Sequence, residues 1–249
     1  MDGFLHTLIS GGIALLYELF SECLQIKYRN TEKVANYAMR RTQDTLYIFF
    51  EKSKGARDWY RNLDFPAKPY KRMGRTLWLA HRGFLRTWKE IEGDIATAVA
   101  DMTVKQIIIT GYSHGAALAV FCHEYVWYHR PDLRDKLQGY GFGCPRVYWG
   151  IPGGKCTRRW ENFTVIRNLN DIVTHVPPAM LGYSHVGTVL EIGIKGRYTP
   201  IEAHYEENIL AMLAEYEAYL KISMETAFAR GSSETKTNSL SPATKEISR

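Results

Sequence analysis

The sequence has little of what marks several common protein classes. It holds four cysteines, irregularly spaced and without a CxxC pair, so it predicts neither a zinc site nor a disulfide framework. The apolar residues 1–20 lack the Lys or Arg that opens a secretory signal, and they are too short and interrupted for a membrane span. We therefore expect a protein that needs no metal or cofactor, and a cytoplasmic location is favoured. An amphipathic helix packed on the domain is the first interpretation of the N-terminal segment, and a weak interfacial anchor is the alternative.

Negative charge is scarce in one part of the chain. Residues 27–86 carry fifteen Lys and Arg against five Asp and Glu, an excess of ten positive charges, whereas the whole chain has a net charge of +6. A basic half of this kind favours peripheral contact with an anionic membrane, although ordinary solvated side chains would give the same pattern. Nucleic acid is an unlikely partner, because no recognition motif is present and the basic residues are not interleaved with aromatic residues.

The chain also lacks internal repeats and internal linkers. Its 249 residues fit one large domain, which we expect over residues 1–230, with a helical segment at 1–44 packed on it. Residues 231–249 are rich in Ser, Thr, Lys and Glu and have few apolar side chains, which predicts a disordered tail. Nothing in the sequence indicates the oligomeric state.

Strand-like and helix-like segments alternate along the domain. The run QIIIT at 106–110 is continuously apolar and β-branched, as in a parallel strand covered on both faces. Alternation of this type predicts an α/β fold with a mostly parallel central sheet flanked by helices. We expect strands at 45–50, 76–80, 106–110, 138–143, 163–167 and, as part of a late hairpin, 188–194. We expect helices at 5–41 with a break near residue 28, and at 84–102, 114–128 and 201–223.

The most specific motif is the GxSxG pentapeptide at residues 111–115, centred on Ser113. A predicted strand enters this motif and a predicted helix leaves it, which is the setting that a nucleophile elbow requires. Glycine two residues before and two residues after the serine lets strand and helix approach closely. Ser113 would then stand at a helix N-terminus, where developing negative charge is favoured. The pattern predicts a nucleophilic serine.

A serine hydroxyl needs a histidine to take its proton and a carboxylate to orient that histidine. Asp171 follows the predicted strand 163–167, so it should lie at the edge of the sheet where α/β sites form. His185 and His204 both follow Asp171, in the order that the α/β-hydrolase arrangement of Ser, acid and His demands. These residues predict a catalytic triad with one of two candidate bases.

Several ordered motifs extend the pattern beyond the elbow. They comprise residues 81–84 (HRGF), 111–119 (GYSHGAALA), 141–147 (GFGCPRV), 171–178 (DIVTHVPP) and 182–187 (GYSHVG). Together they resemble the class 3 lipases, the fungal-lipase-like branch of the α/β-hydrolases, over roughly residues 45–219. The resemblance implies the α/β-hydrolase fold, with Asp171 as the triad acid and His204 as the base. His185 is the second choice for the base, because it matches a structural histidine of the family. His81 would line the substrate side.

The oxyanion hole and a lid are implied in the same way. The N–H of His114, the residue after the nucleophile, is one expected donor. The resemblance makes Ser53 the second donor, although Lys52 stands where the family has a glycine. Trp59 and Leu63 belong to a charged lid candidate at residues 56–65, which an amphipathic surface helix would explain equally well.

The leading functional hypothesis is a serine carboxylic ester hydrolase, lipase-like or esterase-like, that acts on acyl esters through an acyl-enzyme. A phospholipase acting on anionic membranes is one alternative. A catalytically inactive hydrolase fold that serves as a binding module is the other. The presence of Ser113, Asp171 and a downstream histidine in order favours the enzyme.

Overall fold

Over the residues that the structure describes, the central sheet has six strands, of which five are parallel. The computed structural model describes residues 13–29, 35–52, 66–72, 75–150 and 157–237. The sheet order is β1-β2-β5-β6-β8-β10, and β1 is the antiparallel edge strand. The strands are β1 (Tyr37–Thr42), β2 (Thr45–Phe50), β5 (Gln106–Tyr112), β6 (Leu137–Phe142), β8 (Phe163–Asn168) and β10 (Thr188–Ile192). The mostly parallel α/β sheet predicted from the sequence is confirmed.

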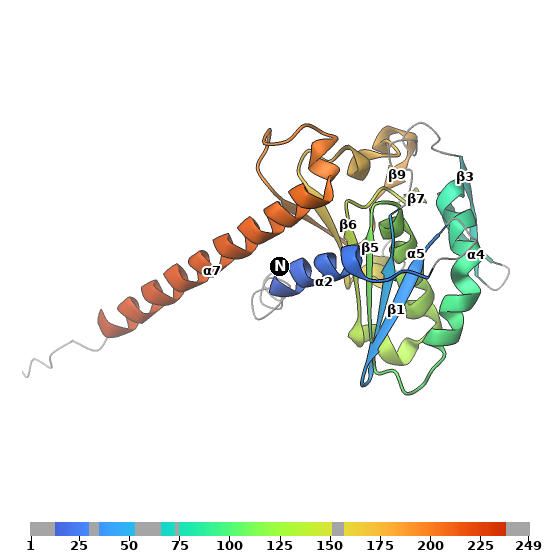
Figure 1. The fold of residues 1–249 in the computed structure, drawn as a ribbon, viewed down its shortest axis with the longest axis horizontal. Coiled ribbons are helices and arrows are strands. Elements are labelled where there is room, and N and C mark those ends of the chain that lie inside the picture. Colours follow the sequence, from blue (N-terminus) through green and yellow to red (C-terminus); the bar gives the residue numbers. More distant parts are fainter. Residues whose placement is uncertain (1–12, 30–34, 53–65, 73–74, 151–156, 238–249) are drawn as a thin grey trace, which may run out of the picture.

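Helices cover both faces of this sheet (Figure 1). One face packs against α4 (Arg82–Val99) and α5 (His114–His129), and the other packs against α2 (Ile13–Gln25) and the start of α7 (Glu206–Thr237). Alternate side chains of β5 divide between the two cores: Ile107 and Ile109 join one cluster, and Ile108 joins the other. The period of two places successive strand residues on opposite faces, so a continuous apolar run fills both cores.

A second, smaller sheet lies beside the first and was not predicted as such. Its four antiparallel strands have the order β3-β4-β7-β9. They are β3 (Ala67–Arg72), β4 (Arg75–His81), β7 (Tyr148–Trp149) and β9 (Tyr183–Ser184). Aromatic rings fill the space under this sheet, where Trp78 lies 5.5 Å from Tyr70 and 5.2 Å from Trp160 between ring centroids. Since β4 leads directly into α4, the small sheet positions the start of that helix.

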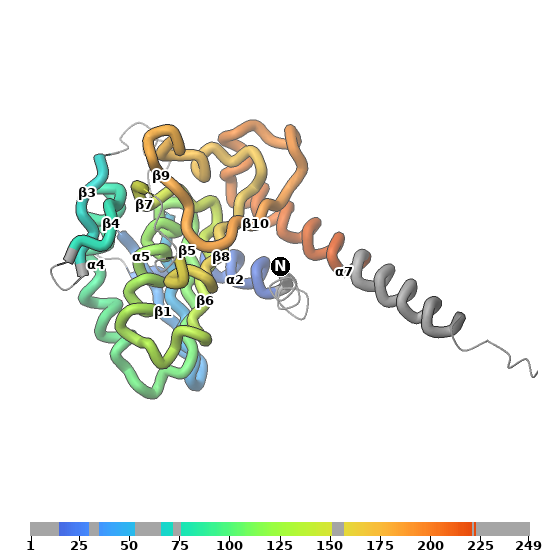
Figure 2. The backbone as a smooth tube through the Cα atoms, turned by 180° about the vertical axis from the view of Figure 1, so that it is seen from behind, coloured from blue at the N-terminus to red at the C-terminus, as the bar shows by residue number. Residues whose placement is uncertain are grey.

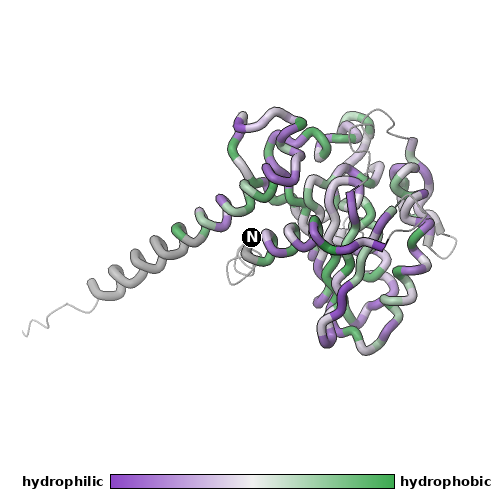
Figure 3. Tube along the Cα trace, in the orientation of Figure 1, coloured by the Kyte–Doolittle hydropathy of each residue, from purple (hydrophilic) through white to green (hydrophobic). Residues whose placement is uncertain are grey.

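The N-terminal segment corrects one prediction. Residues 37–41 fall in a predicted helix, but they form strand β1, which pairs with β2 as a hairpin from Tyr37–Phe50 to Thr42–Thr45. The turn between them uses a left-handed residue, Gln43, with φ of 45°. The exposed turn is hydrophilic (Figure 3), and Tyr37 and Ala38 are buried. Pairing with β2 and burial of these side chains therefore outweigh the helix-like periodicity of the segment.

The structure of the C-terminal part differs from two further predictions, the pairing of the last strand and the bounds of the last helix. Strand β10 pairs in parallel with β8 and is not half of a hairpin, because the chain crosses over before it enters the sheet edge. The last helix begins at Glu206 instead of residue 201 and continues to Thr237 instead of 223. It projects from the body of the molecule in Figures 1 and 2, and its last seven residues fall within the segment 231–249 that the composition predicts to be disordered. Residues 238–249 lie outside the described residues.

Short 3₁₀ helices complete the fold, and four of them carry polar groups discussed below. They are η2 (Pro131–Lys136), η3 (Arg158–Trp160), η4 (Ile172–His175), η5 (Ala179–Leu181) and η6 (Glu202–His204). Three cysteines, Cys23, Cys122 and Cys144, are buried. Among the residues described, no helix combines the length and the apolar character needed to cross a membrane.

Candidate active site

Ser113 stands in a sharp turn between β5 and α5. Its backbone has φ of 56° and ψ of −121°, a conformation that a residue with a side chain rarely adopts. The Ser113 N–H donates to the carbonyl of Phe142 on the neighbouring strand at 2.9 Å, which holds the turn at the sheet edge. A side chain on Gly111 would overlap the main chain of Gly115, and one on Gly115 would overlap that of Phe50. The two glycines of the motif are therefore steric requirements of the turn.

Three side chains meet at this edge in a continuous hydrogen-bond chain. The Ser113 hydroxyl and His204 Nε2 are 2.8 Å apart, and His204 Nδ1 is 2.8 Å from Asp171 Oδ2. The other carboxylate oxygen, Oδ1, accepts from the Val173 N–H at 2.8 Å. All three are buried, with exposures of 3% for Ser113, 5% for His204 and 0% for Asp171. The carboxylate thus favours the tautomer in which Nδ1–H donates and Nε2 accepts from the serine.

His204 is held by contacts to its own main chain and ring. The Tyr112 hydroxyl donates to the His204 carbonyl at 2.5 Å, and its ring stacks on the imidazole with centroids 5.2 Å apart. The side-chain amide of Asn168 donates to the carbonyl of Ala203 at 2.9 Å. Residues from β5 and β8 therefore fix η6, the segment that carries the imidazole. Tyr112 belongs to the GxSxG motif, but nothing in that motif predicts its hydrogen-bond partner, the carbonyl of His204, which lies 92 residues downstream.

Gly143 provides the space for the imidazole. Its φ of 55° lies in the left-handed region, and a β-carbon there would stand 2.6 Å from His204 Cε1 and 3.0 Å from Asp171 Oδ2. Its N–H donates to the Ile166 carbonyl at 3.0 Å, which fixes the backbone against the next strand. Gly143 belongs to the sequence motif at residues 141–147, but the motif alone does not indicate a role for it. The structure explains it, because any side chain would push the imidazole away from its partners.

His114 is the first residue of α5, where main-chain N–H groups have no acceptor inside the helix. That N–H is therefore available beside the Ser113 hydroxyl, as expected of an oxyanion donor. The ring of His114 is buried and lies 5.5 Å from that of Phe84, and burial lowers the pKa of the imidazole to about 4. The ring is thus neutral near pH 7.

The other oxyanion and lid predictions cannot be placed in the same way. Ser53, Trp59 and Leu63 lie outside the described residues. The described part of this loop ends at Lys52, whose ammonium group forms an ion pair with Glu206 at the start of α7. The Lys52 ammonium also lies 5.8 Å above the Tyr112 ring. The lysine that departs from the family pattern therefore joins the loop to the segment just after His204.

The remaining candidate histidines have other partners. His185 Nε2 is 2.7 Å from the Thr174 carbonyl, and burial lowers the pKa of this imidazole to about 4. His175 Nδ1 is 2.9 Å from the Asp171 carbonyl. Both rings therefore support the backbone of η4, and the structure brings His204, not His185, to the serine. His81 is buried, accepts from the Phe84 N–H at 3.3 Å and caps α4, so its substrate-facing role stays a prediction.

Comparison with known proteins agrees with this arrangement. The family model for Lipase (class 3) matches residues 47–181, more than half of the chain. The chain belongs to the class 3 lipase family. The match contains Ser113 and Asp171 and ends before His204, so the place of the histidine rests on the hydrogen bonds above.

Proteins similar to this member of the class 3 lipase family include lipases of fungi. A lipase of Rhizomucor miehei is 30% identical over 159 residues, which cover 59% of this chain and 41% of that protein. The crystal structure of a lipase from Rhizopus microsporus var. chinensis is 26% identical with a TM-score of 0.57, covering 70% of this chain and 62% of that one. A triacylglycerol lipase whose catalytic centre is described as a serine protease triad is 28% identical with a TM-score of 0.58, covering 68% and 66%. The chain spans less than half the length of the curated relatives it matches.

Proposed function

We propose that this class 3 lipase homologue is a serine carboxylic ester hydrolase that acts on acyl esters. The observation that carries the proposal is the unbroken chain Ser113–His204–Asp171, with both contacts of the imidazole at 2.8 Å. A binding module with a hydrolase fold would not need this alignment, because the three groups come from separate parts of the chain and converge only at one point. The proposal is also supported by the triad of the triacylglycerol lipase structure that this chain resembles.

The first half of the reaction forms an acyl-enzyme. Ser113 Oγ attacks the ester carbonyl carbon while His204 Nε2 takes the hydroxyl proton, and Asp171 stabilises the imidazolium that results. The carbonyl oxygen becomes an oxyanion, which accepts a hydrogen bond from the His114 N–H. Collapse of this intermediate breaks the bond to the leaving oxygen. His204 then gives the proton to that oxygen, and the alcohol leaves.

The second half releases the acid. A water molecule attacks the acyl-enzyme carbonyl while His204 Nε2 takes one of its protons, and the same N–H donor stabilises the second oxyanion. Collapse breaks the bond to Ser113 Oγ, which regains a proton from His204, and the carboxylic acid leaves. Asp171 keeps its charge throughout and fixes the tautomer that accepts from serine in each half.

Ser53 remains our proposal for the second oxyanion donor, with Trp59 and Leu63 in a lid over the acyl site. Losing one such donor costs about 2.7–4 kcal/mol of transition-state stabilisation. Ser53→Ala should therefore lower kcat by roughly 100- to 1000-fold with short p-nitrophenyl esters, with little change in KM. Ser53→Ala removes the hydroxyl and keeps the main-chain N–H, so an unaltered kcat would exclude the Ser53 hydroxyl as a donor.

The direct test of the function is Ser113→Ala assayed on short p-nitrophenyl esters. We expect hydrolysis to fall by about 10⁴-fold or more while the circular dichroism spectrum and thermal midpoint stay unchanged. Ser184→Ala is a matched control, because that hydroxyl donates to the Gly150 carbonyl at 3.2 Å in the small sheet and should leave turnover intact. Full activity in Ser113→Ala would reject the proposal. Absence of activity in the unmodified protein on an acyl-chain series would favour the binding module.

A second candidate, hydrolysis of phospholipids on anionic membranes, is favoured by a basic cluster. Lys68, Arg82, Arg86 and Lys89 surround a concavity of about 370 Å³ on β3 and α4. The same helix carries Phe84, whose ring contacts that of His114, so the cluster flanks the catalytic edge. Such a patch would concentrate the enzyme on an acidic lipid surface.

Vesicles of equal size that differ only in the fraction of anionic lipid separate the two candidates. The phospholipase predicts faster cleavage of the anionic vesicles, loss of this preference in Arg86→Gln, and its decline with salt. Arg197→Gln, which alters a residue paired with Glu215 on α7, is the control. Equal cleavage of neutral and anionic vesicles at every salt concentration would reject the phospholipase and favour the acyl ester hydrolase without a membrane preference.

A further inference from the structure

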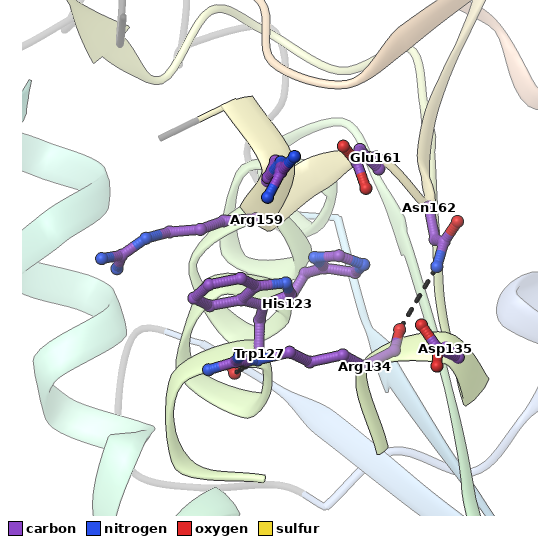
Figure 4. A pocket seen from close by; sticks show the side chains of 8 residues that line it. His123, Trp127, Arg134, Asp135, Arg159, Glu161 and Asn162 are labelled. Atoms are coloured by element: carbon purple, nitrogen blue, oxygen red, sulfur yellow. Dashed lines mark hydrogen bonds between the residues drawn. The ribbon is translucent and has the colours of Figure 1, made fainter. Parts of the chain in front are cut away.

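A pocket of about 290 Å³ lies toward the end of α5 that is remote from Ser113 (Figure 4). Helix α5, η2 and η3 supply its walls. An α-helix rises 1.5 Å per residue, so His123 and Trp127 lie roughly 15 and 20 Å along α5 from the serine. The pocket is therefore separate from the catalytic edge, and its volume suits a molecule the size of a lipid headgroup or an amino acid rather than a whole lipid.

Two guanidinium groups in this pocket have unused donors. The Arg158 side chain is exposed and makes no hydrogen bond or ion pair in the described part of the chain. The Arg134 guanidinium lies 3.8 Å above the Trp127 ring, and among the described residues it donates only through Nε, to the Trp127 carbonyl at 3.1 Å. Stacking on the tryptophan orients the guanidinium and leaves its two terminal nitrogens available. The guanidinium group of a third arginine, Arg159, forms an ion pair with the buried carboxylate of Glu124.

His123 adds a buried polar group to the same pocket. Its side chain is 1% exposed, and burial lowers the pKa of the imidazole to about 3, so the ring is neutral near pH 7. The carbonyl groups of Arg159 and Asn162 lie near enough to favour its protonated form, but neither forms a hydrogen bond of good geometry with a ring nitrogen. A neutral imidazole has one donor and one acceptor, and buried groups of this kind nearly always have a partner. The two ring nitrogens, which lack a hydrogen-bond partner among the described residues, therefore indicate that a ligand binds in the pocket.

Two carboxylates complete the lining. Asp135 and Glu161 form no ion pair with the arginines of the pocket, although opposite charges stand around one small space. In Figure 4 these carboxylates lie on one side, next to Asn162, and the guanidinium of Arg159 lies on the other, next to Trp127. Since Arg159 is paired with Glu124, the pocket is lined by two other arginines, Arg134 and Arg158, and by two carboxylates, with no ion pair between these four groups among the described residues. The pocket therefore suits a ligand that carries both signs.

We propose that this pocket binds a small zwitterion, with an oxyanion held by Arg134, Arg158 and the N–H of His123, and an ammonium group held by Asp135 and Glu161. Guanidinium groups bind phosphate and carboxylate oxygens through paired hydrogen bonds, and the neutral imidazole adds a donor without adding charge. The oxyanion is a phosphodiester or a carboxylate. A lipid headgroup supplies the first together with an ammonium, and a betaine or an amino acid supplies the second.

The test is calorimetric titration of the full chain with glycerophosphocholine, glycine betaine, inorganic phosphate and choline at constant ionic strength. At least one of the two zwitterions should bind ten-fold or more tightly than phosphate or choline alone, and the zwitterion that binds identifies the oxyanion. Binding of phosphate as tight as that of both zwitterions would overturn the proposal. So would the absence of zwitterion binding up to about 10 mM.

Variants locate the binding and control for charge. Arg158→Gln and Glu161→Gln each alter an exposed side chain, and each should weaken zwitterion binding by about ten-fold. Lys195→Gln and Glu207→Gln remove one exposed charge of each sign elsewhere and should have no effect. The imidazole ¹⁵N resonances of His123 should shift on saturation. Unchanged affinity in both pocket variants, or no shift at His123, would overturn the assignment of the site.

Phosphatidylcholine vesicles distinguish a membrane headgroup from a free molecule. If the lipid is the source, vesicles bind the unmodified protein and bind Arg158→Gln less. If only the soluble zwitterion binds, the source is a free molecule, and the pocket retains its assignment.

Discussion

The two ends of α5 hold polar groups in opposite states. At the N-terminal end, Ser113, His204 and Asp171 satisfy one another in a buried chain of hydrogen bonds. Toward the C-terminal end, Arg158 and Glu161 stand in one pocket without pairing. The first set is ordered before any substrate arrives, as preorganised catalysis requires. The second set needs a ligand to complete it, so the same helix joins a site for chemistry to a site for recognition.

The comparison is sharpest when one residue is changed at each end. His204→Ala removes the general base and should lower kcat on p-nitrophenyl esters by about 10⁴-fold or more. Arg158→Gln should leave kcat within two-fold of the unmodified value, because the pocket that it lines contacts α5 at His123 and Trp127, roughly 15 to 20 Å along that helix from Ser113. His185→Ala is the second control and should lose far less than His204→Ala. A larger loss in His185→Ala would move the base to that residue.

A subtler change at the catalytic end is Gly143→Ala. The new methyl group would overlap the His204 ring, so we expect kcat to fall by about 100-fold with KM little changed. Gly196→Ala is the matched control, because Gly196 also has a positive φ, of 80°, but nothing within 4 Å of an added β-carbon. Both variants carry the backbone strain, and only the first should lose activity. Equal turnover in the two variants would show that Gly143 does not govern the position of the imidazole.

Acid should weaken the fold through its buried neutral histidines. Burial lowers the pKa of His185 to about 4, below the unfolded value near 6.5. The unfolded state therefore takes up the proton first, and the stability from this residue is lost as pH falls from about 6.5 toward 4. Urea unfolding at pH 7.5 and pH 5 should show that His185→Gln loses about 1–2 kcal/mol less than the unmodified protein over this interval. The same loss in both proteins would contradict this account.

The smallest predicted effect concerns Tyr112, a positioning residue for His204. Tyr112→Phe removes the hydrogen bond to the His204 carbonyl but keeps the stacked ring, so kcat should fall about ten-fold while KM stays constant. Tyr140→Phe removes a comparable hydroxyl contact, to Gln138, from the adjacent strand and should leave kcat unchanged. A rise in KM with constant kcat in Tyr112→Phe would assign Tyr112 to substrate binding.

Local patterns in the sequence singled out Ser113, Asp171 and His204, whose side chains form one chain of hydrogen bonds in the structure. The GxSxG motif is informative because its glycines are set by contacts within the turn, between β5, α5 and the end of β2. The small antiparallel sheet was only partly predicted, since strands β7 and β9 have two residues each and exist through pairing between distant segments. Strand β1 was mistaken for a helix for a different reason, because pairing with its hairpin neighbour β2 and the burial of Tyr37 and Ala38 outweigh its helix-like periodicity.

The positioning contacts and the remote pocket were beyond sequence reasoning. The partner of Tyr112 is a main-chain carbonyl, which every residue carries, so no residue type marks it. His123 on α5 and Arg158 at the start of η3 both line the pocket. Strand β6 lies between them along the chain, so the two are neighbours only in the folded protein. Arg134 and Arg158 lie outside the basic stretch 27–86, and the unused donors of their guanidinium groups among the described residues are visible only in three dimensions.

The most direct test of the account is covalent labelling with an alkyl fluorophosphonate, followed by peptide mass spectrometry. Attack by Ser113 Oγ on phosphorus expels fluoride and leaves a stable phosphonate ester. We predict one label per chain, on the peptide that contains Ser113, with esterase activity falling in proportion to the labelled fraction and labelling slowed in His204→Ala. A fully labelled protein that still hydrolyses esters, or a label on another residue that abolishes activity, would contradict the assignment of Ser113 as nucleophile.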